Sequence, residues 1–256
     1  MTQPILQISK LTKRFGGVAA VSDVSLQVFP QETLAIIGPN GAGKTTFYNM
    51  LSGRMHPTAG TIMFQGADIT GLPAHRISRM GVSRSFQINN IFNEMTVREN
   101  VEVALTAYHG DSRRWVNIAS RNKPVQQEAD ALLERLSLTE IATKRAGFIS
   151  YGDKRLVEIA VVLATRPQLV LLDEPTAGMT PDETHRVTAL VKSLAATGDY
   201  TFLITEHDMG VVFDVADRIL VMHRGQSLVL GTPQEVKAHP EVRRAYLGDA
   251  EEELAS

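Results

Sequence analysis

The sequence predicts an α/β fold with an inserted helical subdomain, and two observations support this prediction. Short runs that are apolar throughout, as in strands buried on both faces of a parallel sheet, occur at residues 33–38, 168–173 and 200–205. Stretches of helical character follow these runs, at residues 44–53, 181–196 and 209–216. Between residues 88 and 164, by contrast, three segments have helical spacing and none has a strand pattern.

The other segments complete this prediction in chain order. Apolar and polar residues alternate at 20–29 and 61–66, which indicates strands with one exposed face, as in an antiparallel sheet. We therefore expect a first part of the α/β core with an antiparallel β subdomain at 1–87, a helical subdomain at 88–165, and a second part of the core with a C-terminal helix at 166–256. The acidic end of the chain is expected to fray.

The composition is that of a soluble globular protein. With 256 residues, 43% of them hydrophobic, the chain can bury a sizeable core. Its 26 basic and 28 acidic residues nearly balance, which gives no electrostatic reason to expect nucleic acid as a partner. The absence of cysteine excludes disulfides, thiolate metal sites and a cysteine nucleophile. The start of the chain lacks a secretory signal, and no run reaches the roughly 20 apolar residues of a membrane helix. We therefore expect a cytoplasmic protein that contacts membranes only through partners.

Residues 38–46 (GPNGAGKTT) lie directly after a predicted buried strand and directly before a predicted helix. They match the phosphate-loop pattern G-x-x-x-x-G-K-[ST], in which glycines allow successive backbone N–H groups to point at phosphate oxygens. Lys44 is expected to reach the β- and γ-phosphates, and the Thr45 hydroxyl to bind Mg²⁺. The candidate nucleotide-binding residues of this loop are Gly38, Pro39, Asn40, Gly41, Ala42, Gly43, Lys44, Thr45 and Thr46.

Two acidic residues stand at the end of the predicted strand 168–173. Asp173 is expected to hold Mg²⁺ through water, and Glu174 to polarise the attacking water, whereas the alternative is a solvated acidic pair. A GTPase would need the guanine motif N-K-x-D, but the Asn-Lys at 122–123 lacks the aspartate. A small-molecule kinase stays open on these two motifs alone.

Five motifs occur in a fixed order along the chain: the phosphate loop, SFQ at 85–87, SYGDK at 150–154, LLDEP at 171–175 and TEHD at 205–208. This order and spacing resembles the ATPase subunits of ABC transporters over essentially the whole chain. The resemblance implies a P-loop NTPase (RecA-like) core with the cofactors ATP and Mg²⁺. It also implies that Gln87 contacts Mg²⁺ and the attacking water, and that His207 hydrogen-bonds the γ-phosphate. Phe15 occupies the place of the aromatic residue that stacks on adenine, where many relatives have tyrosine.

The motif at 150–154 reads as a second phosphate-binding helix N-terminus. Such a terminus favours an anion by only about 0.3–1 kcal/mol, too little to hold ATP alone, and a plain helix cap is the alternative. The resemblance implies a head-to-tail dimer, in which Ser150 and Gly152 of one subunit contact the γ-phosphate that the other subunit binds. Two residues depart from the family pattern: Asp153, where Gln or Glu is usual, and Thr180, where many relatives have aspartate.

Within the family, the chain resembles the ATPases of branched-chain amino-acid importers (LivG type), a group that includes importers of urea and short-chain amides. The segments that carry this resemblance are 11–28, 85–101, 205–226 and 242–249. ATPases of lipopolysaccharide export are near relatives and form the alternative. A hypothesis from another class is a soluble ABC-type module that acts on nucleic acid or ribosomes, although the chain has neither paired cassettes nor long coiled coils.

The resemblance also implies partners and a location. These are a second ABC ATPase in a homo- or heterodimer, integral-membrane permeases and, indirectly, a substrate-binding protein, but no nucleic acid. The expected location is the cytoplasmic face of the inner membrane, with peripheral attachment through the permeases. Ile88, Ile91 and Phe92 are candidates for permease docking, and the alternative is that they belong to the core of the helical subdomain.

Overall fold

A computed structural model of the chain describes residues 3–85, 91–110 and 123–244. Gln87 and Ile88, which were predicted at the nucleotide site and at the permease contact, lie outside these ranges. Among the residues described, two sheets and eight α-helices form the fold. The domain boundaries at 87/88 and 165/166 stay predictions.

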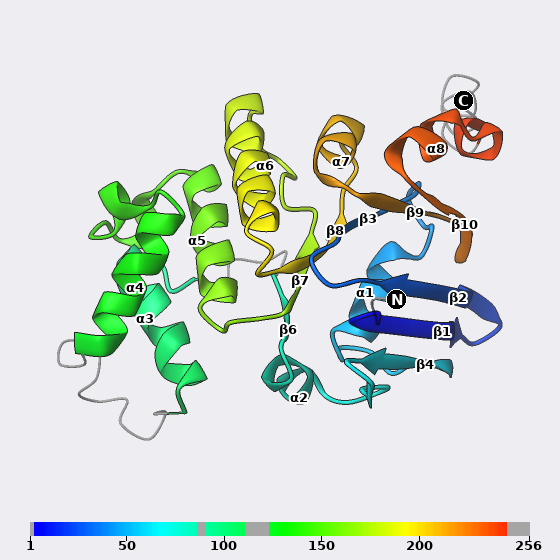
Figure 1. The fold of residues 1–256 in the computed structure, drawn as a ribbon, viewed down its shortest axis with the longest axis horizontal. Coiled ribbons are helices and arrows are strands. Elements are labelled where there is room, and N and C mark those ends of the chain that lie inside the picture. The colour runs from blue at the N-terminus through cyan, green and yellow to red at the C-terminus, as the bar shows by residue number, and fades with distance from the viewer. Residues whose placement is uncertain (1–2, 86–90, 111–122, 245–256) are drawn as a thin grey trace.

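A six-stranded sheet with the order β10-β9-β3-β8-β7-β6 forms the centre of the molecule (Figure 1). Neighbouring strands are parallel except for β10, which pairs antiparallel with β9. Every residue of β3, β7 and β8 is buried, which confirms the prediction made from the three apolar runs. The strands are β3 (Thr33–Ile37), β6 (Val82–Arg84), β7 (Leu169–Asp173), β8 (Thr201–Thr205), β9 (Arg218–His223) and β10 (Gln226–Gly231).

A smaller antiparallel sheet has the order β2-β1-β4-β5. Its strands β2 (Val18–Val28) and β4 (Ala59–Phe64) correspond to the two predicted alternating segments, and both pair with β1 (Leu6–Phe15). The sequence prediction lacked β1, β6, β9, β10 and the two-residue strand β5 (Ala67–Asp68). The antiparallel subdomain itself is confirmed, and so is the mixed α/β class.

The helices follow the predicted alternation. Helices α1 (Lys44–Leu51), α6 (Pro181–Ala196) and α7 (Met209–Val215) come after β3, β7 and β8. In the predicted helical region lie α3 (Val97–Tyr108), α4 (Lys123–Arg135) and α5 (Tyr151–Leu163), which Figure 1 shows in green on the side of the molecule away from the antiparallel sheet. Two short helices complete the set: α2 (Ala74–Arg79) and α8 (Pro233–Ala238).

The central sheet is covered on both faces because alternate residues of its strands enter different apolar clusters. Val170 and Leu172 of β7 belong to a cluster with helices α3 to α6, whereas Leu169 and Leu171 face α1 and the antiparallel strands. Full burial of one such side chain contributes about 1.5–3 kcal/mol. This packing fixes the carboxyl end of β7, where the predicted acidic residues stand.

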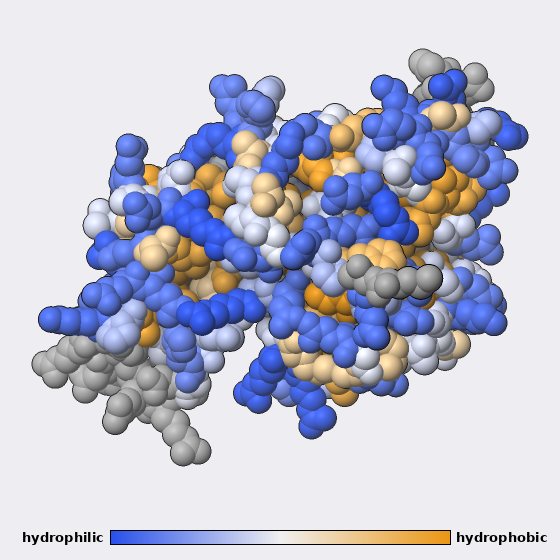
Figure 2. Space-filling model, viewed as in Figure 1, coloured by the Kyte–Doolittle hydropathy of each residue, from blue (hydrophilic) through white to orange (hydrophobic). Residues whose placement is uncertain are grey.

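The outer surface is mostly hydrophilic on the face that Figure 2 shows, with smaller apolar patches between the charged side chains. None of the helices in the described ranges is both long and apolar enough to cross a membrane.

Candidate active site

The phosphate loop connects β3 to α1 and lies against two other strands. Gly38 and Gly43 have φ angles of 154° and 100°. A Cβ atom on Gly38 would come within 2.2 Å of the Met222 carbonyl oxygen, and one on Gly43 within 2.4 Å of the Ala20 carbonyl oxygen. Glycine is therefore required at both positions, because of the backbone conformation and of the close approach of another chain segment.

Lys44 is the first residue of α1, and its side chain folds back over the loop. Its Nζ donates hydrogen bonds to the carbonyl oxygens of Gly38 and Pro39. Burial lowers the pKa of Lys44, while the nearby carboxylates of Glu174 and Asp173 oppose this shift. The ammonium group is thus held at the loop before any ligand enters.

A cavity of about 330 Å³ opens above this loop. Residues 40–46 line it together with Ala20, Glu174 and His207. The structure therefore brings together the predicted phosphate loop and two of the predicted catalytic residues, from three segments far apart in the sequence. Backbone amides at a helix N-terminus, a lysine ammonium and a threonine hydroxyl form a donor set that fits a chain of phosphates.

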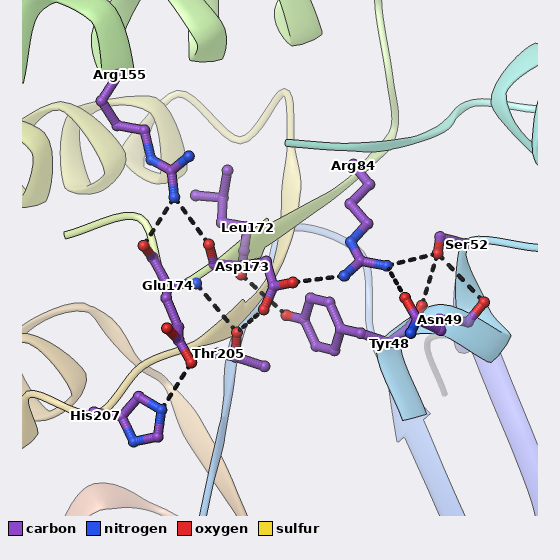
Figure 3. Close-up of polar contacts among 10 residues, drawn as sticks. All are labelled: Tyr48, Asn49, Ser52, Arg84, Arg155, Leu172, Asp173, Glu174, Thr205 and His207. Atoms are coloured by element: carbon purple, nitrogen blue, oxygen red, sulfur yellow. Dashed lines mark hydrogen bonds and ion pairs between the residues drawn. The ribbon is translucent and has the colours of Figure 1, made fainter. Parts of the chain in front are cut away.

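Glu174 and His207 meet beyond the carboxyl ends of the neighbouring strands β7 and β8 (Figure 3). His207 Nε2 lies 2.7 Å from Glu174 Oε1, and the imidazole is 47% exposed. Glu174 has φ 46°, and its amide donates to the Thr205 carbonyl oxygen at 2.9 Å. A left-handed residue at such a turn costs about 1–3 kcal/mol, so the Thr205 contacts hold Glu174 in a strained conformation.

Asp173 is buried and both of its carboxylate oxygens are engaged. Oδ1 accepts a hydrogen bond from the Thr205 hydroxyl at 2.6 Å, and Oδ2 forms an ion pair with Arg84 at 2.5 Å. A metal bound directly to Asp173 would share these oxygens with two existing donors, which favours contact through water.

Two buried arginines at this strand end were missed by the sequence analysis. Arg84 ends β6, and Arg155 on α5 donates to the carbonyl oxygens of Asp173 and Glu174 at 2.9 and 2.8 Å. The available signal for Arg84 was its position directly before the SFQ motif. For Arg155 it was a charge on the apolar face of a predicted helix.

Ser150 and Gly152 lie at the start of α5, and neither lines the cavity above the phosphate loop. The Ser150 hydroxyl caps the helix by accepting from the Asp153 amide at 3.1 Å. The Gly152 amide donates to Glu183 Oε1 at 2.9 Å. Hydrogen bonds from the amides of Gly152 and Thr180 hold the pKa of Glu183 below its usual range. A carboxylate of the same chain thus occupies the amide that was predicted to bind a partner's phosphate.

The two departures from the family pattern both have local structural roles. Asp153 forms an ion pair with Arg186 at 2.8 Å, which joins the first turn of α5 to the second turn of α6. Thr180 is the N-cap of α6 in a capping box with Glu183. Both residues therefore stabilise the junction between these helices within one chain.

Phe15 lies at the end of β1 and is half exposed, with Lys13 Nζ 5.3 Å from its ring centroid. It does not line the cavity above the loop, so its predicted stacking on adenine stays a prediction. Of the residues predicted to dock a permease, Ile91 is buried in the apolar cluster of the helical region, which agrees with the alternative that it is a core residue. Phe92, by contrast, is 51% exposed.

These features define a class of protein. One feature is a glycine-rich loop between a buried parallel strand and a helix, and the other is a carboxylate pair two strands away in the same sheet. Together they form the site of a phosphate-loop nucleotide-binding protein. Comparison with known proteins agrees. A family model described as "ABC transporter" matches residues 21–177, and one described as "Branched-chain amino acid ATP-binding cassette transporter" matches residues 229–252.

Individual relatives cover the whole chain. LivG of Escherichia coli (strain K12), a high-affinity branched-chain amino acid transport ATP-binding protein, is 42% identical over 255 residues, 98% of this chain and 100% of LivG. BraF of Pseudomonas aeruginosa, of the same description, has the same identity and coverage. The crystal structure of the ADP conformation of MJ1267, an ATP-binding cassette of an ABC transporter, has a TM-score of 0.86 at 32% identity and covers 96% of this chain and 100% of that chain. The chain therefore belongs to the ABC transporter family, as an ATPase subunit.

Proposed function

We propose that this chain binds and hydrolyses ATP to drive an importer of branched-chain amino acids or of related amino acids, amides or urea. The proposed substrate class is supported by the 42% identity to LivG and BraF over 98% of the chain, and by the family match at residues 229–252. No feature of the described residues favours the lipopolysaccharide-export alternative. The hydrolytic role is carried by one observation: Glu174 and His207 form a pair at the cavity above the phosphate loop.

In this proposal the loop amides and Lys44 bind the β- and γ-phosphates. Mg²⁺ would be held by the Thr45 hydroxyl, by Asp173 through water and by Gln87, and when bound it neutralises charge on the phosphates. The described residues contain no group of three His, Cys, Asp or Glu side chains that could hold a metal alone. This fits Mg²⁺, which is usually bound by one or two carboxylates together with substrate phosphates.

Glu174 accepts a proton from the attacking water on its carboxylate. In the structure its Oε1 is engaged by His207 Nε2, which holds the carboxyl group at the cavity. When nucleotide enters, His207 exchanges this contact for the γ-phosphate. Ser150 and Gly152 then complete the site of a second ATPase subunit, and the permeases attach the dimer to the cytoplasmic face of the membrane.

Replacing Glu174 by glutamine tests the hydrolytic role. Glu174→Gln keeps the shape and the contact to His207 but removes the base, so ATP binding and an ATP-trapped dimer should persist while turnover falls by about 100-fold or more. The matched control is Glu134→Gln, on the exposed side of α4, which should hydrolyse ATP as the wild type does. Undiminished turnover in Glu174→Gln would contradict the assignment.

Uptake by the native host tests the transport role separately. Cells that carry Glu174→Gln in place of the wild-type chain should lose uptake of labelled leucine, isoleucine and valine, and the protein should co-purify with membrane permeases. Normal uptake of all three amino acids, with loss of a different substrate, would keep the ATPase assignment and change the substrate. Co-purification with ribosomes or DNA would contradict transport.

A further inference from the structure

Arg84 stands at the end of β6 and is one of the few charged side chains inside the described core. Its side chain is 6% exposed and that of its partner Asp173 is 3% exposed. Two buried charges in contact are costly unless their geometry is good and other groups satisfy the remaining hydrogen-bonding atoms. Both terminal nitrogens of Arg84 have such partners, whereas its buried Nε has none. The contacts of the guanidinium group therefore show which elements of the fold it connects.

The guanidinium group bridges two elements (Figure 3). Nη2 donates to Asp173 Oδ2 at 2.5 Å, at the end of β7. Nη1 donates to Asn49 Oδ1 at 2.8 Å and to Ser52 Oγ at 2.9 Å, on α1 and at its C-cap. One planar fork thus connects the catalytic strand to the helix that begins at the phosphate loop.

A tyrosine strengthens the same connection. The guanidinium carbon of Arg84 lies 5.6 Å from the ring centroid of Tyr48 on α1, within the range of a cation–π interaction. The Tyr48 hydroxyl donates to the Leu172 carbonyl oxygen on β7 at 3.3 Å. Arg84 and Tyr48 therefore both hold α1 against the end of β7.

These contacts matter because the two described candidates for metal binding stand on the two connected elements. Thr45 is the second residue of α1, and Asp173 is the last residue of β7. We propose that Arg84 is a positioning residue that sets the placement of the Asp173 carboxylate relative to the Thr45 hydroxyl. This inference rests on the proposed function, because it concerns the metal that accompanies the nucleotide.

The geometry predicts that lysine cannot replace Arg84. A lysine ammonium is a single point, whereas the planar guanidinium group presents nitrogens in two directions, one toward Asp173 and one toward α1. With lysine, Asp173 keeps a charged partner but loses the connection to α1. Replacing a residue that hydrogen-bonds to a metal ligand, without contacting the metal itself, typically lowers metal affinity by about 10–100-fold.

The test measures ATP binding to the full chain as Mn²⁺, an EPR-visible substitute for Mg²⁺, is titrated. In EDTA, Arg84→Lys should bind ATP as the wild type does, because Lys44 and the loop amides are unchanged. The Mn²⁺ concentration that gives half of the metal-dependent gain in ATP affinity should rise by about 10-fold or more. The EPR signal of bound Mn²⁺ should also broaden, because the ligands are less well ordered.

Two further variants exclude a simple loss of stability. Asn49→Ala with Ser52→Ala removes the acceptors on α1 and keeps the Arg84–Asp173 pair, and it should shift the Mn²⁺ requirement in the same direction but less. Leu133→Ala destabilises the apolar cluster of the helical region and should leave the Mn²⁺ requirement unchanged. A shift in Leu133→Ala equal to that in Arg84→Lys would overturn the inference.

The outcomes separate this inference from the proposed function. If metal increases ATP affinity in the wild type and Arg84→Lys has the same Mn²⁺ requirement, the positioning role is wrong and the proposed function stands. If metal does not increase ATP affinity even in the wild type, this inference fails, whereas the proposed function is decided separately by the turnover of Glu174→Gln.

Discussion

Replacing Gly152 by alanine tests whether the amide at the start of α5 contacts a phosphate across a dimer. Gly152 lies in the first turn of α5, and a Cβ atom there would come within 2.6 Å of Glu183 Cγ and 2.8 Å of Glu183 Oε1. Both atoms belong to a flexible side chain, so the methyl group can displace Glu183 without moving the backbone. The clash is therefore confined to the surface that a partner subunit would approach.

The effect of this substitution on the fold should be small, because two contributions oppose each other. Alanine favours a helix over glycine by about 0.5–1 kcal/mol. Displacement of Glu183 removes its reciprocal contacts with Thr180 in the capping box of α6, which costs about 1 kcal/mol. The free energy of unfolding should therefore stay within about 1 kcal/mol of the wild-type value.

The effect on dimerisation should be large. A hydrogen bond between an amide and a charged phosphate contributes about 1.5–3 kcal/mol, so two symmetric sites in a homodimer contribute about 3–6 kcal/mol. In Gly152→Ala the new methyl group would lie 2.8 Å from the place of Glu183 Oε1, which a phosphate oxygen would have to take to reach the same amide. Loss of both contacts should therefore weaken ATP-dependent dimerisation by about two to four orders of magnitude. The assay measures sedimentation of the Glu174→Gln variant in ATP, with and without the additional Gly152→Ala substitution. In a heterodimer only one of the two sites would carry Gly152→Ala, so the free energy of dimerisation should weaken by half of the homodimer value.

Glu183→Ala is the matched variant for this contact, because it removes the carboxylate and leaves the Gly152 amide open. It should lose about 1 kcal/mol of stability from the cap, but it should dimerise at the same ATP concentration as the wild type or at a lower one. Wild-type dimerisation of Gly152→Ala would refute the role of the amide. Loss of dimerisation in folded Glu183→Ala, as severe as in Gly152→Ala, would show that the contact between α5 and α6 matters instead.

Two further predictions concern stability. Thr205→Val removes a hydroxyl that donates to the buried Asp173 carboxylate and should lower the free energy of unfolding by about 2 kcal/mol, measured by urea denaturation. Thr201→Val, on the same strand, loses only a part-buried hydrogen bond from the uncharged backbone N–H of Gln31 and should cost about 1 kcal/mol. Equal losses in the two variants would contradict this account. Burial raises the pKa of Glu102 in the folded state above the usual carboxyl pKa of the unfolded state. Between these two pKa values the folded state binds more protons than the unfolded state, so the free energy of unfolding falls as pH rises through this range. Glu102→Gln should therefore be more stable than the wild type at pH 7, and this advantage should disappear as pH falls below the usual carboxyl pKa. A constant advantage at all pH values would contradict the charge explanation.

Each part of the site that the sequence predicted is a short segment next to an apolar run. Residues 38–46 form one loop, and the apolar run before them identified the strand that positions it. Asp173 and Glu174 were found because they end a second apolar run, whereas the role of His207 was implied by the resemblance to ABC ATPases, through the TEHD motif that follows a third run. In each case a local pattern was enough, since the carboxyl ends of parallel strands meet at one edge of the sheet.

The parts that were missed depend on which elements are neighbours. Arg84 meets Asp173 only because β6 pairs with β7, and β6 has three residues, too few to show a strand period. Thr205 meets Asp173 because β8 pairs with β7 on the other side. Glu183 reaches Gly152 because the N-termini of α5 and α6 are adjacent. A single sequence does not contain the strand order, so no local pattern could identify these partners.

The strand order also explains why so many charged groups gather at the end of β7. Asp173 must be an anion to attract a metal, yet it is buried, and an isolated buried carboxylate would be very costly. The neighbouring strands supply an arginine on one side and a hydroxyl on the other, which stabilise the anion without closing the cavity that Glu174 and His207 line. Arg155 satisfies the backbone carbonyls of the same strand end from α5, the helix that begins at Ser150 and Gly152. A displacement of α5 by a partner subunit would therefore move the backbone of Asp173 and Glu174 directly, which would connect dimer closure physically to the residues proposed to carry out hydrolysis.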